Sequence, residues 1–341
     1  MTGPASAGGR EPRRVQAHLA TAAAALMVAG LTALALCYAI RPPGAYLITV
    51  WPFAFWTLPA ALIAILLLPL LRWRLTVLVA SYALLVTLVI SEEPRFLLRD
   101  LWRDPDAAIT HARSDGTLLR VVTMNCAGGR EGAIRDALAQ RPDVLLLQES
   151  PGELSVSRVA PEGWAHAGWL DPAIMVRGGL DAERLPPHLA HFVYYGIAWP
   201  EALGGRTPVA VLSTRLKLPL LRADLWRPTT WREAAKLREL RATSMAQIAA
   251  QVRAWGTMPI IVGGDFNTPA GDSLFAPLRA GGLTDAFAAV GRGWPDTITS
   301  DFPVARIDQI WVSERFRPLA GRVVFTPNSD HRMVVVDLAL R

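Results

Sequence analysis

The residues with the clearest chemical potential lie in two short motifs of the C-terminal part of the chain. Asp265 and Asn267 belong to Gly-Gly-Asp-Phe-Asn, which follows an apolar run, and Asp330 and His331 end the motif Ser-Asp-His. Alternate side chains of an extended chain point the same way, so Asp265 and Asn267 would share one pocket. A histidine beside a carboxylate can be oriented and made more basic, which suits acid/base chemistry on a leaving group.

Three further polar residues interrupt or directly follow apolar runs. Asn125 follows the run 121–124, Glu149 follows Leu-Leu-Leu-Gln, and Asp308 stands inside Ile-Asp-Gln-Ile-Trp. A buried charge needs a partner or a metal, so carboxylates in these places seldom serve packing. Carboxylate and amide oxygens are the ligands that Mg²⁺ prefers. The set therefore predicts a metal-dependent phosphoesterase.

The elements that would position these residues alternate between strands and helices. Apolar, β-branched runs predict strands, at 118–123, 144–147, 173–176, 209–212, 260–262, 307–312, 322–325 and 333–338. Amphipathic spacing predicts helices, at 131–140 and 230–255. Interleaved strands and helices indicate an α/β domain over residues 117–341. The polar residues fall at or just after strand ends, where rigid strands can position the loops that carry chemistry.

Taken together, these five pieces resemble the endonuclease/exonuclease/phosphatase superfamily, the deoxyribonuclease I-like hydrolases. The order matches: Asn after the first strand, then Gln-Glu, Gly-Asp-Phe-Asn, Ile-Asp and finally Ser-Asp-His. The resemblance covers the chain from about Leu118 to the C-terminus. It implies a four-layer α/β sandwich, in which two mixed sheets lie face to face between helices.

The resemblance also implies a metal site. Glu149 would be the principal ligand of Mg²⁺, for which Mn²⁺ could substitute, and Asn125 and Asp330 would lie close to the same centre. Such a metal would polarise a phosphoryl oxygen and stabilise the leaving group. Asn125 would also contact the substrate.

The same resemblance assigns catalytic roles to four residues. Asp265 would orient or deprotonate the attacking water, and Asn267 would hold that water and the phosphate. Asp308 would orient His331, which would contact the scissile phosphate and support the charge that develops in the transition state.

One segment departs from the family pattern. Many relatives carry a catalytic His or Tyr shortly after the strand represented here by 209–212, where this chain reads Ser-Thr-Arg-Leu. Arg215 would then bind the phosphate, because a guanidinium can clamp it bidentately, although it cannot donate a proton of matched pKa. Alternatively, His188 or His191 supplies the missing group.

The N-terminal quarter of the chain predicts a membrane domain. Hydrophobic residues make up 52% of the 341 residues, and apolar blocks lie at 18–40, 46–71 and 75–90. A span needs about 20 apolar residues, so we expect three transmembrane helices within 18–91, between a tail at 1–17 and a linker at 92–116. Two spans, a cleaved signal peptide, or lipidation of Cys37 are the alternatives.

The basic residues predict an orientation at the cell membrane. Arginines concentrate before the first block and between the second and third, at Arg10, Arg13, Arg14, Arg72 and Arg74. Positive-inside reasoning puts the N-terminus in the cytoplasm and the catalytic domain on the extracytoplasmic side. Arg95, Arg99 and Arg103, which follow the third block, argue mildly the other way.

These observations favour a membrane-anchored phosphodiesterase or nuclease-like hydrolase acting on nucleic acid or phospholipid head groups. A net charge of +6 and the interleaved Arg and Trp residues of 215–241 are compatible with either substrate. A phosphomonoesterase of a small soluble phosphate and a non-catalytic binding module are the competing functions. No obligate protein partner is expected.

Overall fold

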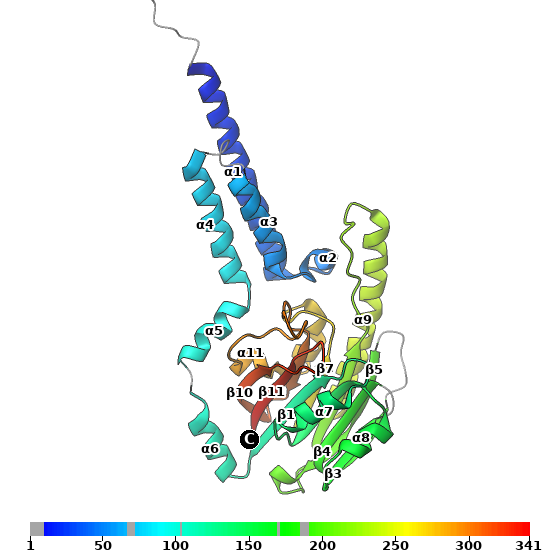
Figure 1. Cartoon of the computed structure of the whole chain (residues 1–341). Helices are drawn as coiled ribbons and strands as arrows, with labels where there is room; N and C mark the ends of the chain where they lie inside the picture. Colours follow the sequence, from blue (N-terminus) through cyan, green and yellow to red (C-terminus); the bar gives the residue numbers. More distant parts are fainter. Residues whose placement is uncertain (1–9, 67–71, 103, 169–170, 185–190) are drawn as a thin grey trace, which may run out of the picture. The chain divides into compact units, whose positions relative to one another are not determined.

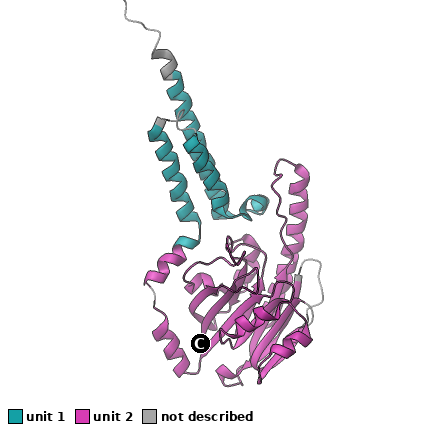
Figure 2. Ribbon diagram, in the orientation of Figure 1, with its two compact units in different colours: residues 1–94 teal, residues 95–341 magenta. Residues whose placement is uncertain are grey.

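The computed structural model describes residues 10–66, 72–102, 104–168, 171–184 and 191–341. The chain divides into two compact units, Met1–Pro94 and Arg95–Arg341 (Figure 2). Apart from short 3-10 turns (Pro43–Ala45, Glu201–Leu203 and Ser273–Phe275), the regular elements are α-helices and strands.

The first unit is helical. Its helices are α1 (Arg10–Ile40), α2 (Tyr46–Thr49), α3 (Phe53–Leu66) and α4 (Arg72–Ile90). Within the described residues, two helices are long and apolar enough to cross a membrane, Val15–Ile40 with 26 residues and Trp73–Ile90 with 18.

The prediction of three transmembrane helices is met by two helices, and the middle block is a bent pair. The segments Pro43–Thr49 and Phe53–Leu66 meet at a bend of 63°, so the block is a third span only if this bent pair counts as one. Pro52 lies at the break, and a proline cannot continue the hydrogen-bond ladder of a helix. The last residues of the block, 67–71, lie outside the described residues.

Polar side chains join the long helices of this unit. The hydroxyls of Thr32 and Tyr82 lie 2.6 Å apart, the Thr87 hydroxyl donates to Thr57 at 2.9 Å, and Trp56 Nε1 donates to the Tyr38 hydroxyl at 3.1 Å. Because these pairs satisfy one another, their hydroxyl and indole groups can lie among apolar helices.

The second unit is built on one mixed sheet of eleven strands (Figure 1). Its strands are β1 (Leu118–Asn125), β2 (Val144–Ser150), β3 (Trp164–Gly168), β4 (Asp171–Arg184), β5 (His191–Pro200), β6 (Val209–Leu216), β7 (Ile260–Asp265), β8 (Thr284–Asp285), β9 (Asp308–Val312), β10 (Phe316–Val324) and β11 (Met333–Leu340). They pair in the order β10-β11-β1-β2-β4-β5-β6-β7-β9-β8, and β3 joins β4.

The predicted pair of separate sheets is therefore corrected to a single curled sheet. The 14-residue strand β4 makes the connection: its first half pairs with β2, and its second half, from Gly178, pairs with β5. Gly178 has a φ of 129°, which only glycine adopts readily, and it separates the two paired halves of the strand.

Three hydrophobic clusters account for the layers. The first lies between the two halves of the curled sheet, with Val121 and Leu146 on one side and Val211 and Ile261 on the other. The second packs the outer face of β6 and β7 against α9 (Pro228–Ala254) and α10 (Ala276–Ala280). The third packs β1, β2 and β11 against α7 (Glu131–Leu138) and α8 (Glu153–Val159). Helices thus cover both outer faces of the folded sheet.

The segment 92–116, predicted as a linker, is mostly helical. It contains α5 (Glu93–Trp102) and α6 (Asp106–Ser114). Phe96 of α5 is fully buried, and its ring meets that of Phe287 in α11 (Ala286–Val290) edge-on with centroids 5.0 Å apart. This part of the segment therefore belongs to the core of the second unit.

Candidate active site

Strand ends bring the polar residues of the sequence motifs to one edge of the curled sheet. Asn125 ends β1 and Glu149 lies near the end of the parallel strand β2. Asp265 ends β7 and is paired directly with Asp308, the first residue of β9. His331 comes two residues before β11, which is antiparallel to β1. Residues far apart in the sequence therefore converge.

The centre of the site is a buried group of two carboxylates and an imidazole. One ligand atom from each of Asp265, Asp308 and His331 lies within 4.8 Å of the others. His331 Nδ1 lies 2.9 Å from Asp308 Oδ2, which orients the ring so that Nε2 is left for another partner. The second oxygen of Asp308, Oδ1, is buried and has no hydrogen-bond partner among the described residues.

Asn125 joins the two halves of the sheet at this edge. Its Nδ2 donates to Glu149 Oε1 at 3.2 Å and to Asp265 Oδ2 at 3.1 Å. Its side-chain oxygen accepts the Ala127 N–H at 2.9 Å, and its carbonyl accepts the Ser329 hydroxyl at 2.7 Å. Ser329, the first residue of the Ser-Asp-His motif, therefore ties that motif to the end of β1.

Asn267 is held by backbone and side-chain contacts to Asp265. It has a φ of 47°, and its N–H donates to Asp265 Oδ1 at 2.8 Å. Its Nδ2 donates to Asp265 Oδ2 at 3.1 Å and to the Leu216 carbonyl at 2.8 Å. The left-handed conformation is uncommon outside glycine but tolerated by Asn, and it places both residues of the motif on one pocket.

Arg241 supports this turn from beneath, and sequence reasoning did not single it out as a site residue. Its guanidinium is fully buried and donates to the carbonyls of Phe266 at 2.9 Å and Asn267 at 2.8 Å, and to the Thr268 hydroxyl. The signal that could have found Arg241 is its helical spacing from Met245 and Ile248, which places it on the same buried face of α9.

Arg215 lies in the site but contacts carboxylates of the protein itself. Its guanidinium lies 2.9 Å from Glu149 Oε1 and 2.6 Å from Asp171 Oδ2. Asp171, the first residue of β4, also accepts the Glu149 N–H at 2.9 Å. Sequence reasoning missed Asp171, although a carboxylate two residues before the predicted strand 173–176 was a signal comparable to that of Glu149, which follows a strand.

The two histidines considered as alternatives to Arg215 are not placed in the site. His188 lies outside the described residues, and only the backbone of His191 is described, paired with Leu216. The Asp330 side chain is exposed and has no hydrogen-bond or ion-pair partner among the described residues. Its role as a metal ligand stays a prediction.

The backbone at Glu149 is unusual. It has a φ of 48°, and the pairing of β2 with β4 is irregular between Leu147 and Ser150. A Glu in the left-handed region is an outlier that the surrounding structure must stabilise. The Asp171 carboxylate and the Gly128 N–H do so, the latter donating to Glu149 Oε2 at 2.8 Å.

The electrostatics of the site separate the roles of its titratable groups. Burial, together with the charge of Asp308, raises the pKa of Asp265 to about 7. Burial lowers the pKa of His331, but the charge and hydrogen bond of Asp308 outweigh it and raise the pKa to about 10. At neutral pH the imidazole is therefore a charged donor, while Asp265 is poised to accept a proton.

The pKa of the Glu149 carboxylate is shifted in the opposite direction to that of Asp265. Burial raises its pKa, but the hydrogen bond from Asn125, the charge of Arg215 and the Gly128 N–H together hold that pKa below the ordinary value. Glu149 is therefore ionised at neutral pH. Its side chain is 26% exposed, against 1% for Asp308, so a cation arriving from solvent reaches Glu149 first.

The donors gathered here fit a hard divalent cation. Carboxylate oxygens of Glu149, Asp265 and Asp308 surround the site, and one buried Asp308 oxygen lacks a partner among the described residues. Mg²⁺ and Mn²⁺ prefer such oxygen donors. Burial is the main cause of the raised pKa of Asp265 and the charge of Asp308 adds to it, so a cation bound here would stabilise the ionised carboxylate.

A curled mixed sheet with hard oxygen donors and an Asp–His pair at one edge is the arrangement of a phosphoester hydrolase. The sequence profile of the Endonuclease/Exonuclease/phosphatase family matches residues 122–331, which include every site residue described above. The chain belongs to this family, whose members are phosphoester hydrolases. The family prediction made from the sequence is thereby confirmed.

Solved structures agree at the level of the fold. An endonuclease/exonuclease/phosphatase from Bacteroides vulgatus matches with a TM-score of 0.52 and 16% identity, over 66% of this chain and 100% of its own. A family protein from Bacteroides thetaiotaomicron gives 0.52 and 17%, over 66% and 96%. The mannosyl-6-phosphatase of that organism gives 0.52 and 15%, over 65% and 100%. Among curated proteins no match was found.

Proposed function

We propose that this protein is a membrane-anchored, Mg²⁺-dependent phosphodiesterase that hydrolyses phospholipid head groups. The observation that carries the hydrolytic part is the buried group of Asp265, Asp308 and His331 beside Asn125 and Glu149. Membrane anchoring is supported by two helices of suitable length and apolarity in the same chain. Positive-inside reasoning favours an extracytoplasmic catalytic domain.

The side chains divide the reaction between them. Glu149 and Asn125 would hold the cation, which when bound would polarise a phosphoryl oxygen and stabilise the leaving group. Asp265, with its pKa near 7, accepts the proton of the attacking water. His331, held protonated by Asp308, donates to a phosphate oxygen as charge develops there.

Exposed apolar residues in chain segments that adjoin site residues favour a lipid substrate. Three chain segments adjoin site residues. The segment 217–227 follows Leu216, whose carbonyl accepts the Asn267 Nδ2 hydrogen bond, and the segment 294–305 contains Ile298, which forms a β-bridge with His331. The segment 325–328 precedes Ser329, whose hydroxyl bonds the Asn125 carbonyl. We call their exposed apolar side chains the apolar rim: Leu218 (58% exposed), Leu221 (52%), Trp226 (78%), Trp294 (44%), Phe302 (78%), Val304 (37%) and Phe325 (50%).

The apolar rim has the composition of a surface that meets a bilayer. Large apolar side chains gathered on a surface mark interaction sites, and tryptophan is favoured at the membrane–water interface. The exposed cations Lys217 and Arg227 accompany Trp226 in the first segment, an arrangement that suits anionic head groups. An active site next to the apolar rim would act on substrates held in the membrane.

Nucleic acid is the weaker candidate, because part of the basic stretch proposed for it is not accessible. Arg238 is 9% exposed and bonds Asp272 at 2.7 Å, and Arg241 is fully buried. Neither can neutralise a phosphate backbone.

The test uses the full-length chain in detergent with Mg²⁺ or EDTA. We expect Mg²⁺-dependent release of head groups from phosphatidylcholine or sphingomyelin vesicles, lost in both Asp265→Asn and His331→Gln. Cleavage of plasmid DNA, or of p-nitrophenyl phosphate alone, would overturn the lipid assignment and leave the hydrolase. Absence of turnover on all substrates would favour a non-catalytic binding module.

A second comparison tests the apolar rim itself. Trp226→Ser combined with Phe302→Ser should reduce turnover of vesicles but leave turnover of soluble bis-p-nitrophenyl phosphate unchanged. Leu154→Ser is the matched control, because this leucine is 84% exposed on α8. Equal vesicle turnover in the wild type and the double variant would refute a role of the rim in docking.

A further inference from the structure

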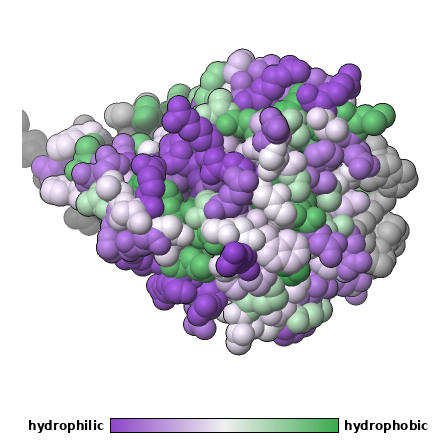
Figure 3. Space-filling model, turned by 90° about the horizontal axis from the view of Figure 1, so that it is seen from below, coloured by the Kyte–Doolittle hydropathy of each residue, from purple (hydrophilic) through white to green (hydrophobic). Residues whose placement is uncertain are grey.

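A second set of charged residues lies at the end of the sheet opposite the active site. Charged residues stand on the side away from the site in three strands: Arg120 against Asn125 on β1, Asp143 just before β2 against Glu149 near its end, and Arg177 against Asp171 across the first half of β4, which pairs with β2. Asn125 lies five positions after Arg120, and at about 3.3 Å per residue this places the two about 16 Å apart along the strand. Figure 3 shows hydrophilic residues gathered in patches on the face seen from below, and Figure 1 shows β1 beginning at this end.

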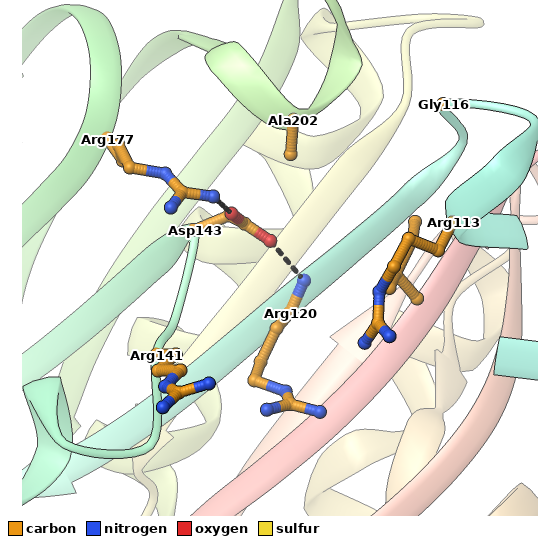
Figure 4. A pocket seen from close by; sticks show the side chains of 8 residues that line it. Arg113, Gly116, Arg120, Arg141, Asp143, Arg177 and Ala202 are labelled. Carbon is orange, nitrogen blue, oxygen red and sulfur yellow. Dashed lines mark hydrogen bonds and ion pairs between the residues drawn. The ribbon is translucent and has the colours of Figure 1, made fainter. Parts of the chain in front are cut away.

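These charged residues line a cavity of about 460 Å³. Its wall combines four arginines, one carboxylate and small or apolar residues: Arg113, Arg120, Arg141, Arg177, Asp143, Gly116, Leu118 and Ala202. In Figure 4 the guanidinium groups of Arg113, Arg120 and Arg141 lie along one side, while Asp143 is joined to Arg177 and to the backbone of Arg120.

The acidic partners in and beside the cavity are already engaged. Asp143 Oδ2 accepts the Arg120 N–H at 2.8 Å, and its other oxygen accepts from Arg177. The Arg120 guanidinium is bound bidentately by Asp337, at 2.6 and 3.0 Å. Each carboxylate thus neutralises one arginine of the wall.

Two arginines remain as surplus positive charge. Within the part of the chain that the structure describes, the side chains of Arg113 and Arg141 have no hydrogen-bond or ion-pair partner. Arg141 also has a φ of 55°, a conformation that is uncommon for a residue other than Gly, Asn or Asp. Nearby, burial lowers the pKa of Arg322, and the charge of Arg120 lowers it further against the opposing charge of Asp337.

We propose that this cavity binds a dianionic phosphate ester, with Arg113 and Arg141 as the residues that pair with it. Guanidinium groups match phosphate oxygens with two parallel hydrogen bonds, and two of them facing one cavity can hold a dianion. The cavity volume falls in the range of small-molecule sites. It is larger than a bare phosphate needs. Leu118 and Ala202 offer the organic part a small apolar surface.

This inference does not depend on the proposed function. The site shares no residue with the catalytic group, and its ligand need not be hydrolysed. A soluble phosphate ester and the phosphomonoester head group of a lipid present the same chemistry, so the experiment uses one probe of each kind.

Binding to the full-length chain in EDTA would be measured by calorimetry with adenosine monophosphate and by flotation with phosphatidic acid vesicles. We expect saturable binding of at least one probe, weakened at least tenfold by Arg113→Gln with Arg141→Gln. Arg253→Gln, an exposed arginine on α9, and Asp265→Asn in the active site should leave the affinity within twofold of the wild type.

Each outcome decides the proposal. Binding of only one probe identifies the source of the ligand, and Arg113→Lys with Arg141→Lys, which keeps the charge, should retain part of the affinity. Absence of saturable binding of either probe would overturn the site. Unchanged binding in the Gln variant, or loss of binding in Asp265→Asn instead, would also overturn it, the latter by assigning the ligand to the active site.

Discussion

Substitution of Arg241 by Met should disturb both the stability of the domain and its catalytic turn. The guanidinium is fully buried and donates to three acceptors of residues 266–268. Met keeps the length and apolar stem of the side chain but removes every donor. The two carbonyls and the Thr268 hydroxyl would then be buried without this partner, directly beside Asp265 and Asn267.

The expected magnitude follows from those contacts. Each buried acceptor left unsatisfied costs about 1–3 kcal/mol, and because the Phe266 carbonyl keeps the Thr268 hydroxyl as a donor, the total loss over the three acceptors should be about 3–5 kcal/mol. At about 2–4 °C per kcal/mol for a domain of this size, Tm should fall by about 6–20 °C. Because Asn267 loses an anchor of its left-handed turn, turnover should fall about tenfold to a hundredfold at temperatures where the variant is folded.

The assay is thermal unfolding of the full-length chain followed by tryptophan fluorescence, together with Mg²⁺-dependent turnover. Arg253→Met is the matched control, because this arginine lies on the same helix but is exposed. Surface substitutions of this kind change stability by less than about 0.5 kcal/mol. If Arg241→Met unfolds within about 2 °C of the control and retains full turnover, the buried guanidinium does not support the turn as argued.

Three further predictions concern the metal-free site, the cation and the core. In EDTA, the His331 pKa of about 10 lies above its unfolded value, so the contribution of His331 to stability is complete below about pH 6.5 and is lost as pH rises through 10. Unfolding scans from pH 6.5 to 10 should therefore show a fall in Tm. An equal fall in His331→Gln would contradict this. Saturating Mg²⁺ should stabilise the fold by about 2.7 kcal/mol at a hundredfold excess over Kd and so raise Tm. Glu149→Gln should abolish this rise, whereas Glu153→Gln, at an exposed glutamate, should keep it. Phe96→Ala should lower the free energy of unfolding by about 3–5 kcal/mol, while Leu101→Ala, at a side chain that is 75% exposed, should have little effect; similar losses in the two would show that α5 is not anchored in the core.

The elements that carry the site were largely readable from the sequence, because their signals are local. The apolar runs at 118–123, 144–147 and 260–262 are confirmed as β1, β2 and β7, and each strand carries at or near its end a polar residue named beforehand. Their burial pattern is nearly continuous, as for strands covered on both faces. Strands β3, β5 and β8 were not predicted, and β4 and β10 were predicted only in part. β3 and the second half of β4 are partly exposed and lack such a run.

The chemistry of individual residues was also readable where it depends on type and neighbours alone. Asp, Asn and His at the ends of apolar runs indicated hydrolysis of a phosphate ester, and the family they suggested is confirmed. In contrast, amphipathic spacing predicted the long helix 230–255 but did not show that its buried face includes Arg238 and Arg241. Hydropathy could not show this, because a buried arginine is tolerated only when distant carbonyls and carboxylates are there to accept its hydrogen bonds.

By itself, the sequence determined the apolar helices, the principal strands and the polar residues that stand at the ends of those strands, because each depends on a few neighbouring residues. Tertiary structure alone decided how these meet. Asn125 reaches Asp265 across 140 positions, and Arg215 turns to Glu149 and Asp171. The long strand β4 joins what looked like two sheets into one. Strand pairing and burial set these contacts, and both depend on partners that are distant along the chain.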